Sequence, residues 1–228
     1  MMTDLSQIKV VIFDLDGTLV DTEKIYHAGW RHVLKDYGVS ISQETLDKMR
    51  GGSREYINQL VQTLLGDNKA MMLEARKKRD AYFNEVITKE NITRKEGALD
   101  LLTYIKSKEI PIAVATSSPK ERGEAILESS KLIPYIDFSI YGDQIQQSKP
   151  QPDIYLKVLD HYQLNSQEAV VVEDSYTGLL ASTRAKIPTF YVPEIPFKEG
   201  EFERIDKNYF IDSYTSLKEI KNILINKS

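Results

Sequence analysis

Six short apolar runs, separated by stretches with helical spacing, limit the folds that are open to this chain. They lie at residues 9–13, 111–116, 138–142, 169–174, 188–192 and 208–213. Because apolar residues are nearly continuous along each run rather than alternating, each is predicted to be a strand covered on both faces. Helical patterns at 96–110 and 152–162 lie between such runs, and the second opens with Pro152. The sequence therefore predicts an α/β fold with a doubly wound parallel sheet.

The segment from Val20 to Asn91 interrupts this alternation, because it contains no strand-like run. Its patterns at 26–38, 54–66 and 68–87 are all helical. We therefore predict two domains: a sheet-containing core from residues 1–19 and 92–228, and an inserted all-helical domain from residues 20–91. The basic run at 75–80 within the insert is interpreted as the solvent-exposed face of a helix.

The composition argues against several classes of partner and site. Lys and Arg number 30 against 34 Asp and Glu, so the net charge of −4 leaves no positive excess to neutralise a nucleic-acid backbone. The absence of cysteine removes disulfides, thiolate nucleophiles and cysteine-bound metals. No apolar run reaches the roughly 18 residues that span a bilayer, and the amino terminus lacks the apolar stretch of a secretory signal. We expect a cytoplasmic protein with no nucleic-acid or membrane partner.

Acidic pairs follow two of the predicted strands. Asp14 and Asp16 come after the first run, and Glu173 and Asp174 end the fourth. Carboxylates this close raise each other's pKa unless a cation holds them. Ligands of open parallel sheets bind at the carboxyl ends of the strands, and carboxylate oxygens suit Mg²⁺ better than Zn²⁺. The two pairs together predict a Mg²⁺ site, although Asp14 and Asp16 alone could instead start a turn and cap the next helix.

Two further strand ends carry groups that bind anions. Thr116 and Ser117 offer hydroxyl and N–H donors directly before a proline-initiated helix. Lys149 lies in "SKPQPD", where Pro150 and Pro152 restrict the backbone. Taken singly, these features are also compatible with an ordinary helix cap and a solubilising charge. A metal site, a donor-lined anion pocket and a fixed cation together indicate phosphoryl transfer.

In chain order, "DLDGT", "ATSS", "SKPQPD" and "VVVEDS" resemble the four motifs of the haloacid dehalogenase (HAD) superfamily, and the insert takes the place of that family's helical cap. The resemblance implies that Asp14 is a nucleophile that forms an aspartyl-phosphate. It implies that Asp16 is the general acid and base, and that Thr116 and Lys149 hold the phosphoryl oxygens. The dehalogenases that name the superfamily lack the second aspartate, so Asp16 argues against their reaction.

The same resemblance supplies a metal-binding set. It implies that Mg²⁺ is bound by Asp14, Asp174 and the backbone carbonyl of Asp16, with Glu173 either a ligand or a neighbour of the ligands. The expected cofactor is therefore Mg²⁺, and the expected partner is a small-molecule phosphate ester. We expect a monomer or weak dimer.

The helical insert is the part of the chain that should select the substrate. Arg50 and Arg54 in "RGGSRE" resemble the cap loop of β-phosphoglucomutases. The histidine of that cap, however, aligns with Tyr26, and His27 lies one residue further, about 100° around a helix. "DTEKIY" instead resembles the cap entry of phosphatases that act on sugar and nucleoside monophosphates. The predicted substrate contacts are Ser117, Arg50, Arg54, Tyr26 and His27, although Tyr26 is equally compatible with the core of the insert.

The function predicted from these residues is a Mg²⁺-dependent phosphatase for a sugar or nucleoside monophosphate, with a β-phosphoglucomutase-type mutase as the alternative. Two readings from other classes stay open. A signalling receiver domain has a similar sheet and acidic cluster, but it has no helical insert after its first strand. A binding protein on an inactivated scaffold would be expected to have lost a motif residue.

Overall fold

The chain divides into two compact units. The computed structural model describes residues 7–49, 54–89, 92–194, 197 and 199–226. The sheet unit comprises Met1–Asp21 and Ile92–Ser228, and the helical unit comprises Thr22–Asn91. Val20 and Asp21 are predicted to lie in the insert, whereas they fall in the sheet unit, where Val20 forms β-bridges with Asp16 and Arg94.

The sheet unit is built on six parallel strands. They are β1 (Val10–Phe13), β2 (Ile112–Thr116), β3 (Phe138–Tyr141), β4 (Ala169–Glu173), β5 (Thr189–Tyr191) and β6 (Phe210–Ser213), in the order β3-β2-β1-β4-β5-β6. Every residue of β1, β2 and β4 is buried, as their continuous apolar runs predict. The predicted doubly wound α/β fold is confirmed.

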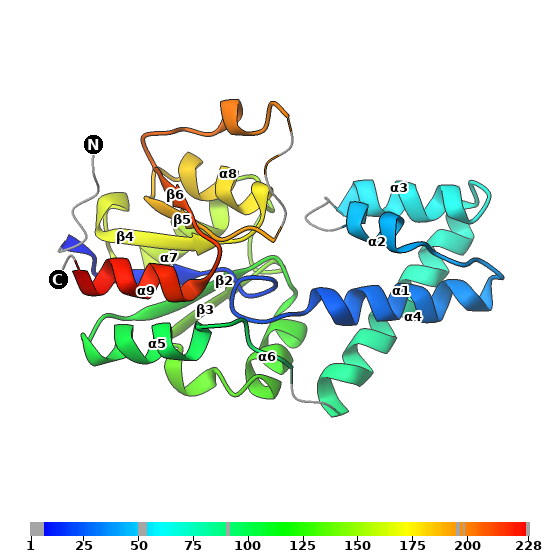
Figure 1. Cartoon of the computed structure of the whole chain (residues 1–228), viewed down its shortest axis with the longest axis horizontal. Coiled ribbons are helices and arrows are strands. Elements are labelled where there is room, and N and C mark those ends of the chain that lie inside the picture. The colour runs from blue at the N-terminus through cyan, green and yellow to red at the C-terminus, as the bar shows by residue number, and fades with distance from the viewer. Residues whose placement is uncertain (1–6, 50–53, 90–91, 195–196, 198, 227–228) are drawn as a thin grey trace. The chain divides into compact units, whose positions relative to one another are not determined.

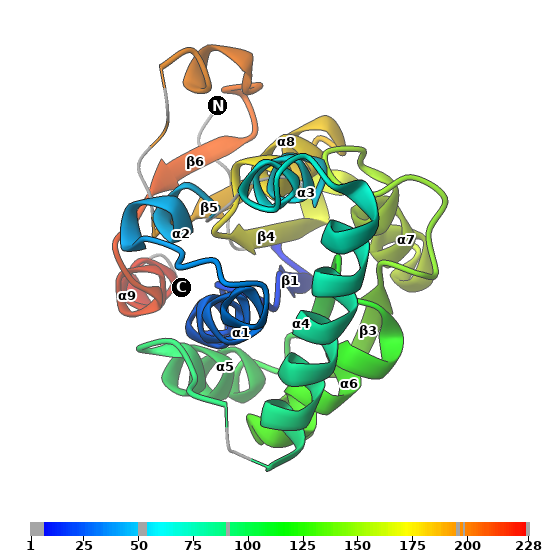
Figure 2. The ribbon, with the colours of Figure 1, turned by 90° about the vertical axis from the view of Figure 1, so that its right-hand side faces the viewer.

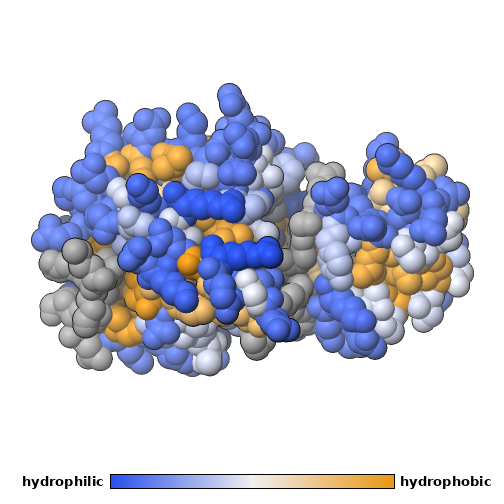
Figure 3. Space-filling model, turned by 90° about the horizontal axis from the view of Figure 1, so that it is seen from above, coloured by the Kyte–Doolittle hydropathy of each residue, from blue (hydrophilic) through white to orange (hydrophobic). Residues whose placement is uncertain are grey.

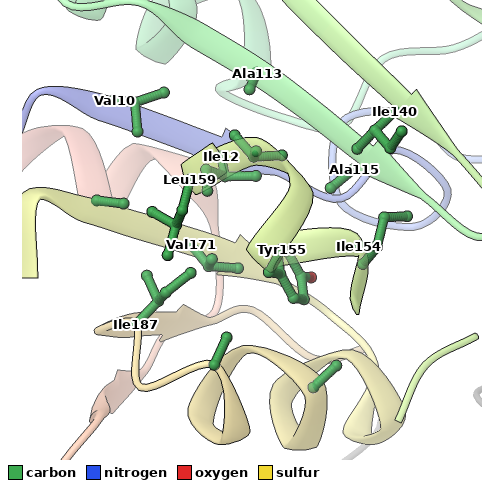
Figure 4. Close-up of a cluster of buried hydrophobic side chains, with 14 residues drawn as sticks. Val10, Ile12, Ala113, Ala115, Ile140, Ile154, Tyr155, Leu159, Val171 and Ile187 are labelled. Atoms are coloured by element: carbon green, nitrogen blue, oxygen red, sulfur yellow. The ribbon is translucent and has the colours of Figure 1, made fainter. Parts of the chain in front are cut away.

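Helices cover both faces of this sheet. They are α5 (Ala98–Ser107), α6 (Lys120–Ser129), α7 (Asp153–Tyr162), α8 (Tyr176–Arg184) and α9 (Leu217–Asn226). Helices α7 and α8 lie on one side of the sheet, and α5 and α9 lie on the other (Figures 1 and 2). Under α7, the buried side chains of Ile154 and Leu159 pack against strand residues such as Ile12 and Val171 (Figure 4). Both faces being covered explains why the strands carry no polar alternation.

The helical unit contains α1 (Glu23–Asp36), α2 (Gln43–Met49), α3 (Arg54–Leu64) and α4 (Lys69–Lys89). All four helices contribute side chains to an apolar core within this unit, which includes Trp30, Leu46, Val61 and Met72. The spacing of these residues along their helices gives each helix an apolar face that the others cover.

One prediction for the helical unit is wrong in part. Lys77 and Lys78 of the basic run at 75–80 are exposed, as predicted, but Arg79 is 4% exposed. Its guanidinium lies over the rings of Tyr26 and Trp30, at 4.7 and 5.1 Å from their centroids, and it pairs with Asp80. A guanidinium is weakly hydrated and stacks on aromatic faces, so burial is less costly for arginine than a count of charges suggests.

Hydrophilic residues predominate on the surface drawn in Figure 3. The larger apolar side chains that remain exposed among the described residues include Tyr56 and Leu73 in the helical unit and Ile133 and Leu156 in the sheet unit. Within the described residues, every helix is too short or too polar to cross a membrane.

Candidate active site

The register of the three central strands brings the acidic motifs together. Phe13, the last residue of β1, pairs with Val114 of β2 on one side and with Val172 of β4 on the other. The backbone N–H of Asp14 then donates to the carbonyl of Val172 at 3.0 Å. Asp14 therefore lies beside the end of β4, where the second acidic pair begins.

Lys149 is the cation at this edge of the sheet. Its Nζ lies 2.5 Å from Asp14 Oδ1 and 2.6 Å from Glu173 Oε1, and it also donates to the carbonyl of Ala115 at 3.1 Å. Its side chain is 4% exposed. An ammonium group has three donors, and these three acceptors use all of them. Lys149 thus links β1, β2 and β4 and is held in one position.

Glu173 is fully buried, and both of its oxygens are engaged. Oε1 accepts from Lys149 and from the hydroxyl of Tyr155 at 2.9 Å, and Oε2 accepts from the backbone N–H and hydroxyl of Ser175 at 2.9 and 3.0 Å. The sequence analysis left open whether Glu173 binds the metal directly. These contacts favour a role beside the ligands, because its oxygens already have protein donors.

Asp174 is placed against the turn that follows β1. Its Oδ1 accepts from the hydroxyl of Thr18 at 2.7 Å. Gly17 has φ of +89°, and a Cβ there would lie 2.2 Å from Asp174 Oδ2. Two features require glycine at this position: the backbone conformation is strained for other residues, and the carboxylate of Asp174 occupies the space of a side chain. Asp174, which directly follows β4, can therefore approach the loop that carries Asp14 and Asp16.

Asp16 is held by hydroxyl groups from the loop after β2. Its Oδ2 accepts from Ser118 Oγ at 2.9 Å and from Thr116 Oγ1 at 3.2 Å, and Thr116 Oγ1 accepts from the N–H of Ser118 at 3.0 Å. Thr116 and Ser118 are both buried, whereas Ser117 is exposed. The structure thus brings predicted Thr116 to Asp16, and leaves the Ser117 side chain outside this hydrogen-bonded set.

The buried carboxylates are not balanced by positive charge. Burial raises the pKa of Asp14 to about 8, with Lys149 opposing the rise and Glu173 adding to it. Burial and the charges of Glu173 and Asp14 raise the pKa of Asp174 well above its usual range. Burial alone would lower the pKa of Lys149, but Asp14 and Glu173 hold that pKa well above its usual value. Lys149 is therefore cationic, and one cation faces several acids.

This charge imbalance fits a bound divalent cation. Among the described residues, no three Asp, Glu or His side chains form a ready-made metal cluster. Mg²⁺ does not need one, because it is commonly bound by one or two carboxylates and keeps several waters. Asp14 and Asp174, with a backbone oxygen from the Asp16 turn, are a donor set of that kind. The raised pKa values of the two carboxyl groups reflect burial and mutual repulsion of negative charge, which a bound cation would relieve.

The substrate contacts predicted in the insert stay predictions. Arg50 lies outside the described residues, as does the side chain of Arg54, the first residue of α3. Tyr26 stacks on Phe83 with ring centroids 4.3 Å apart and takes part in the Arg79 cluster. His27 is buried, and its Nε2 lies 3.4 Å from Glu23. Tyr26 and His27 therefore have packing partners within the helical unit, and their contact with substrate stays a prediction.

Four side chains at the site were not predicted from the sequence. Thr18, Ser118 and Ser175 lie inside quoted motifs, and their hydroxyls were a signal that could have been followed. Tyr155 gave no such signal, because a tyrosine in an apolar helical pattern is expected in the core. Its contact with Glu173 depends on the packing of α7 against β4.

Comparisons with known proteins agree with this geometry. The family model described as "Haloacid dehalogenase-like hydrolase" matches residues 11–192. The phosphorylated carbohydrates phosphatase of Thermotoga maritima is 34% identical over a match that covers 80% of this chain and 84% of the phosphatase. The fructose-1-phosphate phosphatase YqaB of Escherichia coli is 29% identical over a match that covers 77% of this chain and 91% of YqaB. A crystal structure from Thermotoga maritima, described provisionally as a β-phosphoglucomutase, has a TM-score of 0.75 and 27% identity over 96% of this chain and 99% of its own.

Proposed function

Because the chain belongs to the haloacid dehalogenase-like hydrolase family, as the motifs predicted, we propose that it is a Mg²⁺-dependent phosphatase for a small phosphorylated carbohydrate. The observation that carries the proposal is the buried contact of Lys149 with Asp14 Oδ1 and Glu173 Oε1 at the carboxyl edge of the sheet. It fixes a carboxylate beside a cation, as nucleophilic attack on a phosphate ester requires. The two phosphatases named above support the carbohydrate substrate.

In the first step, Asp14 attacks the phosphorus atom of the ester. Lys149 holds Oδ1, which leaves Oδ2 to form the new bond. The bond between phosphorus and the ester oxygen breaks, and Asp16 gives its proton to the departing alkoxide. The products of this step are the free alcohol and an aspartyl-phosphate at Asp14.

In the second step, water hydrolyses the aspartyl-phosphate. Asp16, now ionised, accepts a proton from the water as the water oxygen bonds to phosphorus. The bond between phosphorus and Asp14 breaks, and inorganic phosphate leaves. Ser118 and Thr116 keep the Asp16 carboxylate near the reacting groups.

The residues proposed to hold Mg²⁺ are Asp14, Asp174 and the carbonyl of Asp16. When bound, the ion supplies positive charge that masks the phosphate and stabilises the transition state. Glu173 is proposed to act on Lys149 rather than as a ligand. The helical unit is proposed as the cap that selects the substrate, with Arg50 and Arg54 as its candidate contacts.

The proposal is tested with a panel of phosphorylated metabolites that includes hexose phosphates, pentose phosphates and nucleoside monophosphates. We expect Mg²⁺-dependent release of inorganic phosphate, fastest with one or a few sugar phosphates. If nucleoside monophosphates alone are hydrolysed, the carbohydrate assignment is wrong. A stoichiometric burst without turnover would instead indicate a protein that only accepts phosphate.

A mutase remains the second candidate, because the Thermotoga maritima structure is similar to this chain over nearly its whole length. Incubation with β-glucose 1-phosphate and a trace of the bisphosphate separates the two. Formation of glucose 6-phosphate would support the mutase, and release of inorganic phosphate supports the phosphatase. Tyr26 at the position of the mutase histidine favours the phosphatase, since tyrosine does not replace imidazole as a base near neutral pH.

A further inference from the structure

Tyr155 is a buried tyrosine whose hydroxyl points to the active site rather than to solvent. The residue lies on α7, and its side chain is fully buried among apolar residues of the sheet and of α8 (Figure 4). Its hydroxyl donates to Glu173 Oε1 at 2.9 Å. The same oxygen accepts from Lys149, whose Nζ also lies 5.0 Å from the centroid of the Tyr155 ring.

Tyr155 therefore affects the position of the Lys149 ammonium in two ways, through its ring and through its hydroxyl. The ring limits the ammonium on one side and attracts it as a cation–π partner. The hydroxyl satisfies part of the charge on Glu173 Oε1, so that this oxygen does not draw Lys149 away from Asp14. A phenylalanine would fill the same apolar space, so packing alone does not account for the hydroxyl.

We propose that Tyr155 is a positioning residue for catalysis, which acts through Glu173 to keep the Lys149 ammonium against Asp14. This inference rests on the proposed function, since the phosphoryl chemistry gives Lys149 its role. Tyr155 touches neither the substrate nor Asp14 in the proposal. The contribution of its hydroxyl therefore passes through one carboxylate oxygen, Glu173 Oε1.

The first test is the variant Tyr155→Phe. Loss of one hydrogen bond to a charged group is expected to lower kcat about tenfold and to change KM by less than about twofold. Tyr162→Phe is the matched control, because its hydroxyl lies on the same helix, is buried, and has no hydrogen-bond partner among the described residues. The control is expected to keep wild-type kcat.

A double-mutant cycle separates positioning from general stabilisation. In a Glu173→Gln background, Tyr155→Phe should cost less than about twofold in kcat, because the route through Glu173 is already cut. Equal losses in both backgrounds, or a Tyr155→Phe variant with wild-type kcat, would overturn the inference. Thermal unfolding of each variant shows whether it is folded.

A spectroscopic measurement tests the inference without turnover. The ¹⁵Nζ signal of the Lys149 ammonium, assigned by its absence from Lys149→Arg, should shift in Tyr155→Phe and stay in place in Tyr162→Phe. An unchanged signal in Tyr155→Phe would contradict the inference even if no substrate were found. Absence of phosphate release from the wild type would count against the proposed function alone.

Discussion

The acids at the carboxyl edge of the sheet have two kinds of partner, an ammonium group or a hydroxyl group, and the partners indicate different roles. Asp14 contacts the cation of Lys149, whereas Asp16 contacts the neutral hydroxyl of Ser118. Asp174 accepts from the hydroxyl of Thr18. The ammonium of Lys149 opposes the rise in the pKa of Asp14 and so favours the ionised form that a nucleophile needs, whereas the hydroxyl of Ser118 positions Asp16 without adding a charge beside it.

Replacing the proposed nucleophile should remove turnover without unfolding the chain. Asp14→Asn keeps the shape of the side chain but not its negative charge, and Lys149 keeps Glu173 as its partner. We expect phosphate release to fall about a thousandfold or more, with a thermal midpoint at or above that of the wild type. Asp160→Asn, at an exposed position on α7, is the matched control. Activity of Asp14→Asn within tenfold of the wild type would exclude Asp14 as the nucleophile.

Ser118 should affect the rate through Asp16. Ser118→Ala removes the shorter of the two hydroxyl contacts to Asp16 Oδ2, so the acid is less well placed during both proton transfers. We expect kcat to fall about three- to tenfold with little change in KM. Ser130→Ala provides the control, because within the part of the chain that the structure describes this buried hydroxyl donates inside its own turn, to the carbonyl of Leu127. Equal kinetics in the two variants would show that Ser118 does not support Asp16.

Helix α8 contributes through its first turn, which packs directly on the end of β4. Ser175 caps the helix by accepting from the N–H of Gly178, and it also donates to Glu173. A Cβ on Gly178 would lie 1.6 Å from Glu173 Oε1. The absence of a side chain at Gly178 is therefore what lets α8 begin next to the carboxylate that holds Lys149.

Gly178→Ala tests this packing. Alanine would favour a helix by about 1 kcal/mol over glycine. The Glu173 carboxylate cannot move aside freely, because both of its oxygens are hydrogen-bonded. Overpacking costs about 1–3 kcal/mol of unfolding free energy, and a contact this short should place the cost at the upper end of that range, above the gain in helix propensity. We expect a lower thermal midpoint and a reduced kcat. Gly29→Ala, in the helical unit, meets its nearest atom at 3.1 Å and should be much milder; an equally mild Gly178→Ala would refute the packing argument.

At the scale of the whole molecule, the sheet could be predicted from the sequence and much of the site's detail could not. Strands buried on both faces must be continuously apolar, which made β1, β2 and β4 visible as runs, and the partly exposed β3 and β6 also fall within predicted runs. The meeting of the acids that follow β1 and β4 could be predicted from the parallel topology. The partners of Glu173 depend on how Tyr155 of α7 and Ser175 pack against β4, which no local pattern records. Arg79 was misassigned for the same reason, since its aromatic neighbours come from another helix.

Metal binding should be visible in the stability of the whole chain. If Mg²⁺ binds the folded protein at the acidic edge, it relieves the repulsion that raises the pKa values of Asp14 and Asp174. At a hundred times its Kd, such an ion adds about 2.7 kcal/mol to the unfolding free energy. We expect thermal unfolding to shift upward with Mg²⁺ but not with equal ionic strength of KCl, and the shift to be lost in Asp174→Asn. A Mg²⁺ shift that survives in Asp174→Asn would place the ion elsewhere.

The most direct test of the central claim is to trap the phosphoryl group on the chain. A reaction with a hydrolysed phosphate ester is quenched within one turnover and treated with borohydride, which reduces an acyl phosphate but not a free carboxylate. Peptide mass spectrometry is predicted to find homoserine at position 14 and unmodified aspartate at position 16. Steady hydrolysis with Asp14 unmodified at every quench time, or with the reduction at another acid, would contradict the account.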